Sequence, residues 1–390
     1  MKSILKGISL SAANAAENDP PRERGISSAP LRRFPFPGVG CLQGAGLTVI
    51  AFALVMMSGA VQAVESQVKP RDLTDMSLET LLEAEVTPIN VLGSHTHLAG
   101  EWMVGFRYMY QDMTQNYDGT RKVSPGEVLQ SYPVVHTRMT TQMEMVELMY
   151  APLDTLNFMA MVPFMQMTMD HLDRNGEEFS AKSSGIGDLN LMALVNVYGN
   201  PRERGNRLVL NAGLTVPTGS INQMDRRTGH PMRLEYWMQL GSGTVNLEPG
   251  LAYLGESENW AWGVHGLGVL PVGYNENEYR LGSQYFVDAW AEYKVSNWFG
   301  PSVRLNWRQQ FDIHGADPDL DPARNPAFDA TKQEGERLEA VGGLNFYVGN
   351  GVFKGARFSV EGGVPMYQNI DGPNLGVAWF ITAGCSYTFD

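Results

Sequence analysis

From residue 101 to the C-terminus, apolar and polar residues alternate along the chain with a period of two. Twelve stretches show this pattern, and they span 101–113, 137–151, 156–171, 185–198, 207–216, 244–255, 260–270, 279–294, 298–311, 337–348, 355–367 and 375–389. A period of two is the main sequence signal of a β-strand that has one face in apolar surroundings. The sequence therefore predicts an all-β fold of about twelve strands.

The segments that connect these stretches alternate in length. The short ones are 152–155, 199–206, 256–259, 295–297 and 349–354, and the longer ones are 114–136, 172–184, 217–243, 271–278, 312–336 and 368–374. Outer-membrane barrels alternate in this way because one rim carries brief periplasmic turns and the other carries larger external loops. A closed barrel also leaves no unpaired strand edge in lipid. We therefore predict a closed antiparallel transmembrane β-barrel over residues 101–390, in the outer membrane of a Gram-negative bacterium.

The first hundred residues have a different character. Residues 47–57 (LTVIAFALVMM) form an apolar run that follows basic residues and precedes the small-residue sequence VQA at 61–63. This is the layout of a secretory signal peptide, and the run is too short to span a bilayer as a helix. We assign 1–63 to a signal peptide with an atypically long leader. Leucines form a stripe in residues 72–86, which predicts a short helix, so 64–100 is assigned to a periplasmic helix and entry segment.

Charge and motif content exclude several classes of function. The chain holds 29 basic and 42 acidic residues and a net charge of −13, which argues against nucleic acid as a partner. Some outer-membrane barrels are lipases that pair a histidine with a serine two residues away. None of the seven histidines has a serine two positions before or after it. We predict that the chain is not an enzyme and holds no tightly bound cofactor.

The predicted partners follow from the barrel. Aromatic residues near the predicted strand ends fit the girdles that contact the lipid headgroups, and they are Trp102, Tyr110, Tyr150, Trp260, Tyr279, Tyr293 and Trp298. The sequence DPDLD at 317–321 predicts an acidic external loop that divalent cations bridge to lipopolysaccharide. The lumen would take a small solute or a metal ion.

Methionines concentrate on one face of three predicted strands. Nine of the 21 methionines lie between Met139 and Met169, mostly at every second position. If the apolar face of each strand contacts lipid, the opposite face lines the lumen, and it carries Met103, Met109, Met113, Met143, Met145, Met149, Met159, Met161, Met165, Met167, Met169 and His171. The charges Glu101, Arg107 and Glu147 share that face. Because a charge near the lipid midplane costs about 2–4 kcal/mol, these charges indicate that the methionines point inward.

Further candidate residues belong to the same interior. Asp188, Glu248, Arg304 and Arg308 are predicted lumen charges, and their mixed signs favour interior salt bridges over solute binding. His95 and His97 precede the first strand at the predicted periplasmic mouth. In an extended segment two side chains at this spacing lie on one face, so the pair is a candidate metal site.

Three interpretations of the methionine wall remain open. Neutral sulfur ligands favour Cu(I) and similar soft ions over hard cations, so the wall fits transient passage of Cu(I) or Ag(I). Methionine also adapts to irregular apolar ligands, so the wall equally fits small hydrophobic or aromatic compounds. The third interpretation is a structural barrel whose lumen the methionines simply fill.

Several short motifs carry a resemblance to a known family. They are Gly100-Glu101-Trp102-Met103, Met149-Tyr150-Ala151-Pro152, residues 184–189 (SGIGDL), residues 217–220 (PTGS) and residues 238–244 (MQLGSGT). Together they resemble the outer-membrane transporter family named for the meta-pathway of phenol degradation. The resemblance implies a barrel that passes small, often hydrophobic, molecules. The version rich in Met and His is similar to a branch associated with metal handling, which favours a channel suited to soft ions such as Cu(I).

Overall fold

The computed structural model describes residues 95–225 and 231–389 of the chain. The predicted signal peptide at 1–63 and the predicted helix at 72–86 lie outside these residues. All described residues belong to one compact unit. No helix in the described part of the chain is both long and apolar enough to cross a bilayer.

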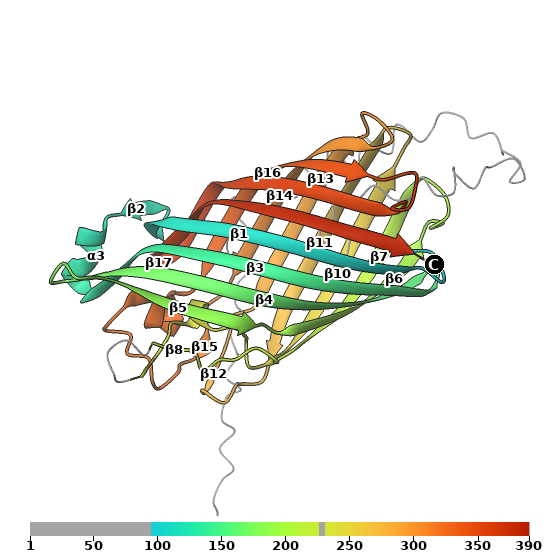
Figure 1. Cartoon of the computed structure of the whole chain (residues 1–390). Helices are drawn as coiled ribbons and strands as arrows, with labels where there is room; N and C mark the ends of the chain where they lie inside the picture. Colours follow the sequence, from blue (N-terminus) through green and yellow to red (C-terminus); the bar gives the residue numbers. More distant parts are fainter. Residues whose placement is uncertain (1–94, 226–230, 390) are drawn as a thin grey trace, which may run out of the picture. The chain divides into compact units, whose positions relative to one another are not determined.

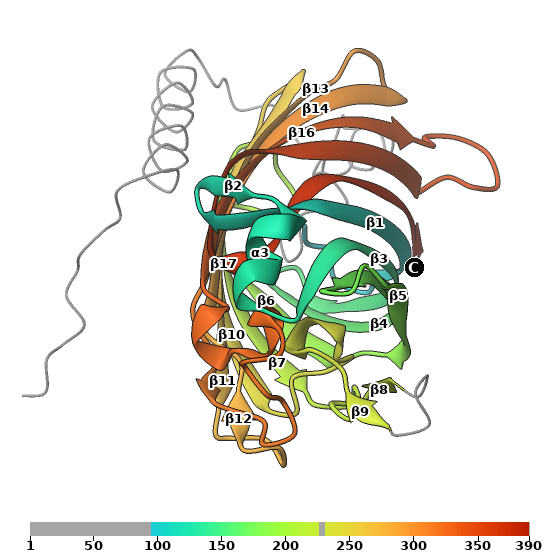
Figure 2. The ribbon, with the colours of Figure 1, turned by 90° about the vertical axis from the view of Figure 1, so that its left-hand side faces the viewer.

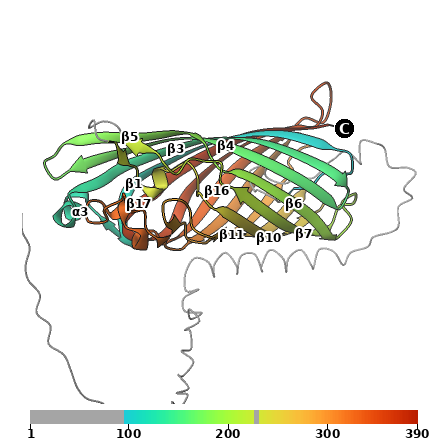
Figure 3. The same cartoon turned by 90° about the horizontal axis from the view of Figure 1, so that it is seen from below.

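Antiparallel strands form one sheet that closes on itself (Figure 1). The strands of the wall are β1 (Trp102–Gly119), β3 (Val134–Leu153), β4 (Leu156–Asp173), β5 (Glu178–Ile186), β6 (Leu189–Tyr198), β7 (Asn206–Val216), β10 (Val245–Glu256), β11 (Trp260–Val272), β13 (Gln284–Tyr293), β14 (Phe299–Gln310), β16 (Gly335–Tyr347) and β17 (Ala356–Phe389). The last strand pairs with the first from Trp102 opposite Phe389 to Gly119 opposite Ile370. This pairing removes the free edges that lipid would not tolerate. Figure 3 shows the strands of the near and far walls crossing in projection, as expected for tilted strands of a barrel.

The number of strand segments around the ring agrees with the twelve strands predicted from the sequence. In the described residues, eleven strands succeed one another around the ring from β1 to β17, and β5 lies beside this path on β4. Strand β17 contributes two neighbouring segments to the wall, because residues 357–370 pair with β16 and residues 370–389 pair with β1. The ring therefore consists of twelve strand segments. The predicted strand at 185–198 is interrupted, because its first two residues belong to β5 and residues 189–198 form β6. Strand β5 pairs with residues 164–172 of β4, whereas β6 pairs with residues 156–161 of β4.

The outward face of the wall is apolar. Phe106 and Val146 are opposite each other in β1 and β3, and their exposed fractions are 44% and 56%. Aromatic pairs flank this band on both sides: Trp102 stacks on Tyr150 at 4.4 Å, and Tyr110 lies 5.3 Å from Trp379. These positions fit an apolar belt between two interfacial girdles. The girdle prediction is wrong for Tyr279, which is 1% exposed inside a loop cluster.

The two ends of the barrel differ. Both Trp102 and Phe389 lie at the end that carries short turns, which is the periplasmic end by the outer-membrane rule. We call it the inner end. The other, outer end carries the small elements (Figure 2), namely β2 (Arg121–Val123), α3 (Pro125–Ser131), β8 (Met224–Asp225), β9 (Met232–Arg233), η2 (Tyr236–Met238), β12 (Tyr279–Arg280), β15 (His314–Gly315), η3 (Pro326–Phe328) and η4 (Ala330–Lys332).

One predicted outer loop is absent among the described residues. The segment 172–184 was expected to be long, but β4 and β5 continue toward each other and leave only residues 174–177 between them. The side chain of Asp173 stabilises this tight turn by accepting hydrogen bonds from the backbone N–H groups of Asn175 and Glu177, both at 2.8 Å. Local side-chain acceptors of this kind are common in turns.

The outward face gives a direct test of the barrel. We expect Val146→Arg to lower the free energy of unfolding by about 2–4 kcal/mol, because it places a charge near the lipid midplane. Ser184→Arg is the matched control, since Ser184 is exposed on β5 in the outer part of the wall. Denaturant unfolding in lipid vesicles would measure both. Equal stability of the two variants would contradict the assignment of the lipid-facing side.

Candidate functional site

The interior methionines form rows that run across neighbouring strands. In the strand register, Met103, Met149, Met159 and Met192 lie opposite one another, and we call them the inner row. The middle row is Met109, Met143 and Met165, and the outer row is Met113, Met139 and Met169. Side chains that lie directly opposite on one face of an antiparallel sheet are in contact distance. Each row therefore places thioethers from adjacent strands side by side.

The structure places the remaining predicted methionines on the same inward face. Met145, Met161 and Met167 lie between the rows on β3 and β4, opposite Pro163, Glu147 and Thr141. Met192 extends the inner row to β6, and the sequence reasoning missed it. Its strand carries a single methionine, so no repeated pattern marked it.

The inner row belongs to a packed apolar layer. Its four methionines are at most 3% exposed, and they pack with Leu194 of β6 and with Val209, Ala252, Leu254, Ala261 and Trp290 from four further strands. Gly263 makes room for the Trp290 ring, since a Cβ at this glycine would lie 2.8 Å from that ring. Dense packing of this kind narrows the interior near the inner end of the barrel.

A polar cluster lies beside the inner row. Arg107 Nη2 is 3.3 Å from Glu147 Oε2, His95 Nε2 is 3.7 Å from Glu147 Oε1, and His97 Nδ1 is 3.5 Å from Glu101 Oε2. The cavity that His95, His97, Arg107 and Glu147 help to line is about 10 Å³, room for about one water molecule. The two imidazoles are 5.7 Å apart and edge to face, and each approaches a different carboxylate. The extended segment thus brings both histidines to the interior but directs them to separate partners.

The outer row lies under a loop. Met139, Met167 and Met169 are 3–5% exposed and pack with Leu234, Met238 and Leu240 of the segment 217–244. The middle row is less buried than the inner row, because Met109, Met143 and Met165 face inward yet are only partly buried, as is Met113 of the outer row. The interior therefore consists of an inner apolar layer, a middle zone with accessible thioethers, and an outer layer formed with a loop.

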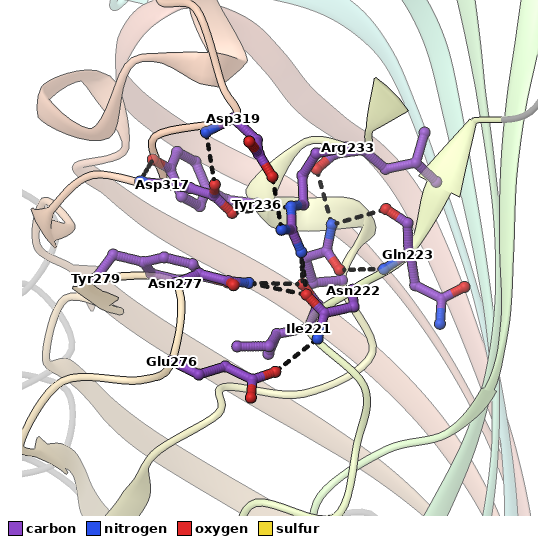
Figure 4. Close-up of polar contacts among 12 residues, drawn as sticks. Ile221, Asn222, Gln223, Arg233, Tyr236, Glu276, Asn277, Tyr279, Asp317 and Asp319 are labelled. Carbon is purple, nitrogen blue, oxygen red and sulfur yellow. Dashed lines mark hydrogen bonds and ion pairs between the residues drawn. The ribbon is translucent and has the colours of Figure 1, made fainter. Parts of the chain in front are cut away.

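Three outer loops interlock above this wall, and we call their described residues the cap: 217–225 with 231–244, 273–283 and 311–334. Arg233 joins two of them (Figure 4), since its Nε lies 3.2 Å from Asp317 Oδ2, and its Nη2 lies 2.9 Å from Asp319 Oδ2. Its Nη1 also donates to the Ile221 carbonyl oxygen at 3.1 Å. Asn277 of the third loop donates to the same carbonyl at 3.2 Å. Arg233 thus joins two of the loops, and Asn277 attaches the third loop to the same carbonyl oxygen.

An apolar cluster supports the same junction, and it contains Tyr236, Tyr279, Ile313, Leu320, Phe328 and Ala330. The Asp317 backbone N–H donates to the Tyr236 hydroxyl at 3.0 Å, and Asp317 is 2% exposed. This residue was expected on an acidic loop that faces lipopolysaccharide. It is turned inward to Arg233 instead, because a buried guanidinium requires a carboxylate partner, while Asp319 and Asp321 stay exposed.

The predicted lumen charges hold the wall and the cap in place. Asp188 accepts hydrogen bonds from the Gly219 backbone at 2.9 Å and from the Ser242 backbone and hydroxyl at 2.7 Å, so it fastens both ends of the loop 217–244. The other contacts are Glu248 with Asn190 and Thr215, Arg304 with Asp288 and Glu361, and Arg308 with the ring of Phe286. These contacts agree with a bracing role for the mixed charges.

The cap meets the wall at a buried cluster of His136, His171, Glu235 and Asn325. Glu235 Oε1 lies 2.9 Å from His171 Nε2 and 3.5 Å from His136 Nε2. Burial would raise the pKa of Glu235, but its interactions with the His136 and His171 imidazoles outweigh burial and hold the pKa below its ordinary value. Sequence reasoning found His171 alone. His136 falls one residue outside a predicted strand, and Glu235 lies in a loop without a motif.

Comparisons with known proteins agree with this architecture. A family model described as "MetA-pathway of phenol degradation" matches residues 140–362. The COG4313 outer membrane channel from Pseudomonas putida F1 aligns with a TM-score of 0.57 and 16% identity, covering 78% of this chain and 100% of that one. The transport unit of the autotransporter AIDA-I from Escherichia coli scores 0.41 with 13% identity over 80% and 96% of the two chains. A Pseudomonas aeruginosa FadL homologue scores 0.38 with 10% identity over 75% and 90%. No curated protein matches the sequence.

The junction between cap and wall should be sensitive to acid. Because the pKa of Glu235 is lowered by folding, its contribution to stability is present above its ordinary pKa of 4.5 and is lost as the pH falls below that value. We expect the cap loops to become sensitive to an acid-active protease below about pH 4.5. Glu235→Gln should raise cleavage at neutral pH by about tenfold, because removing a buried hydrogen-bond acceptor leaves its partners unsatisfied, which costs about 1–3 kcal/mol.

The matched control for that variant is Glu178→Gln, since Glu178 is an exposed carboxylate at the outer end of β5. Mass spectrometry of the fragments would locate the cuts within 217–244 and 311–334. Identical cleavage of the Glu235→Gln and Glu178→Gln proteins at neutral pH would show that Glu235 does not hold the cap.

Proposed function

The chain belongs to the family described as "MetA-pathway of phenol degradation", and from this membership we propose that it is a narrow outer-membrane channel for small hydrophobic or aromatic compounds. The family match covers more than half of the chain and bears out the resemblance carried by its motifs. The chain also shares its barrel fold with an outer-membrane channel. The proposed protein is a non-enzymatic conduit, and its substrate class follows from the lining of the barrel.

The middle row carries the proposal. Met109, Met143 and Met165 offer partly accessible thioethers to the interior, between one packed apolar layer and the outer layer under the cap. Such a surface favours an apolar solute over an ion or a sugar, because a thioether donates no hydrogen bond and accepts one only weakly. A thioether is polarizable and makes favourable contacts with aromatic rings. A ring-sized apolar molecule fits this chemistry.

The two packed layers imply that passage is coupled to side-chain movement. Methionine has three rotatable bonds and no branch, so it can change rotamer without breaking a hydrogen bond. The inner row can therefore yield to a solute while the backbone hydrogen bonds of the wall stay intact. A barrel of this size leaves little room once its interior side chains are placed. Because the interior is crowded, the channel would select solutes by their size and polarity.

A second candidate is passage of soft metal ions, and one observation favours it. Each row brings thioethers of three or four neighbouring strands side by side, and sulfur ligands prefer Cu(I) and Ag(I). Three spaced rows would form successive weak sites, and conduction requires sites that release the ion as well as bind it. The two candidates differ in whether sulfur itself is needed.

The variant that replaces Met109, Met143 and Met165 with leucine separates them. Leucine keeps the apolar bulk of methionine and removes the sulfur, and such exchanges usually cost less than about 1.5 kcal/mol each. If the channel passes apolar compounds, flux of toluene into proteoliposomes should stay within about twofold of wild type. The corresponding triple glutamine variant should reduce toluene flux by about tenfold or more, because it lines the same zone with amides that prefer water.

The same vesicles should be loaded with a fluorescent reporter of Ag(I). The soft-metal proposal would replace the organic one if two results were found together. The leucine variant would lose silver flux, and none of the proteins would pass toluene. Absence of both fluxes in the wild-type barrel would leave a structural role. Leu148→Met, on the lipid-facing side of β3, is the matched control for the methionine exchange and should change neither flux.

A further inference from the structure

Three side chains from three separate segments converge at the outer end of the barrel. His136 and His171 are a cross-strand pair of β3 and β4, and Glu235 enters from the cap loop 217–244. Their ligand-type atoms all lie within 4.8 Å of one another. Each of the three residues is at most 3% exposed. In the part of the chain that the structure describes, this is the one group of three or more metal-ligating residues of His, Cys, Asp or Glu type that meets so closely.

The spacing of these atoms fits a cation. Bonds of about 2.1 Å from a tetrahedral metal to nitrogen or oxygen place neighbouring ligand atoms about 3.4 Å apart. His136 Nε2 lies 3.5 Å from Glu235 Oε1, and His171 Nε2 lies 2.9 Å from the same oxygen. The first distance already matches, and the second needs to open by about half an ångström. A rotation of the Glu235 carboxylate would supply that change.

The amide of Asn325 marks the place where acceptor atoms of the cluster converge. Its Nδ2 is 2.8 Å from His136 Nε2 and 3.3 Å from Glu235 Oε1, so one N–H₂ group donates toward both. An imidazole nitrogen that accepts a hydrogen bond presents its lone pair, which is the state that metal binding requires. Asn325 Oδ1 is engaged by the Ala327 backbone N–H at 3.0 Å. The amide nitrogen thus lies where two lone pairs converge, and the Asn325 side chain would have to swing aside for a cation to take that place.

Unsatisfied polar atoms and a small cavity adjoin the cluster. Glu235 Oε2 and His171 Nδ1 are buried without a hydrogen-bond partner among the described residues. A cavity of about 20 Å³, lined in part by His171, Glu235 and Asn325, has room for a water molecule. The nearby charge of Arg233 is compensated by Asp317 and Asp319, so it does not oppose a cation.

We propose that His136, His171 and Glu235 bind one divalent transition-metal cation of the Zn²⁺ type, with a water molecule as fourth ligand. Two imidazoles and a carboxylate are borderline and hard donors, so this site selects Zn²⁺, Co²⁺ or Ni²⁺ over Cu(I). It is separate in chemistry from the thioether rows and does not depend on what the barrel passes. The bound cation would clamp the cap loop to strands β3 and β4.

Metal binding to the untagged, chelator-treated protein tests the proposal, with Co²⁺ as the probe because its visible absorption reports coordination. We expect one Co²⁺ per folded chain, displaced by Zn²⁺. His136→Gln, His171→Gln and Glu235→Gln should each weaken binding by about 100-fold or more. His314→Gln is the matched control, since His314 is an exposed histidine of the cap, and it should bind as wild type. Heat-modified mobility on gels shows that each barrel is folded.

A fourth variant keeps the test decisive if a glutamine variant fails to fold. His171→Cys supplies a thiolate at the same position, and a sulfur-to-cobalt charge-transfer band would prove that this side chain coordinates the metal. Binding of Zn²⁺ should also slow proteolysis of the loops 217–244 and 311–334 in the wild type. A folded wild-type barrel that binds no Co²⁺, or equal binding by His136→Gln and His314→Gln, would overturn the proposal.

Discussion

The rest of the structure depends on backbone hydrogen bonding in lipid. A strand that crosses a bilayer has no water to satisfy its N–H and C=O groups, so every strand needs a partner on both sides. The pairing of β1 with β17 meets this requirement by closing the ring. Once the ring is closed, the two faces of each strand are assigned, because the period of two leaves only lipid and lumen. The positions of the methionines follow from that single condition.

This constraint explains which features the sequence could predict. Alternation along β1, β3 and β4 indicated the inward side of each strand, since a slip of one residue would place Arg107 and Glu147 in lipid. The number of strand segments was predictable for the same reason. The rows of methionines were not, although the inward side was. Rows depend on the register between strands, which turns and bulges set and which a single strand's pattern does not contain.

The cap and its junction required the structure. Glu235, Arg233 and Asp317 lie in long loops, where no periodicity relates a residue to its partner. Their contacts join residues more than 60 positions apart, such as Glu235 with His171 and Arg233 with Asp317. The cost of leaving a buried charge unpaired selects these partners in the folded chain. Tyr279 was misplaced for a related reason, because an aromatic residue near a strand end can enter either a girdle or a loop core.

The contrast between wall and interior bears on how such a barrel can both persist and conduct. The wall is held by directional hydrogen bonds around the ring, which cannot open locally in lipid without leaving polar groups unsatisfied. The interior is held by thioether packing, which is non-directional and tolerates a change of rotamer. Conduction as proposed would therefore rely on movement of the methionine rows and of the cap. The cap is fastened by polar contacts at Arg233 and Glu235, so in the proposed channel its opening would respond to charge, whereas the rows would respond to the size and polarity of the solute.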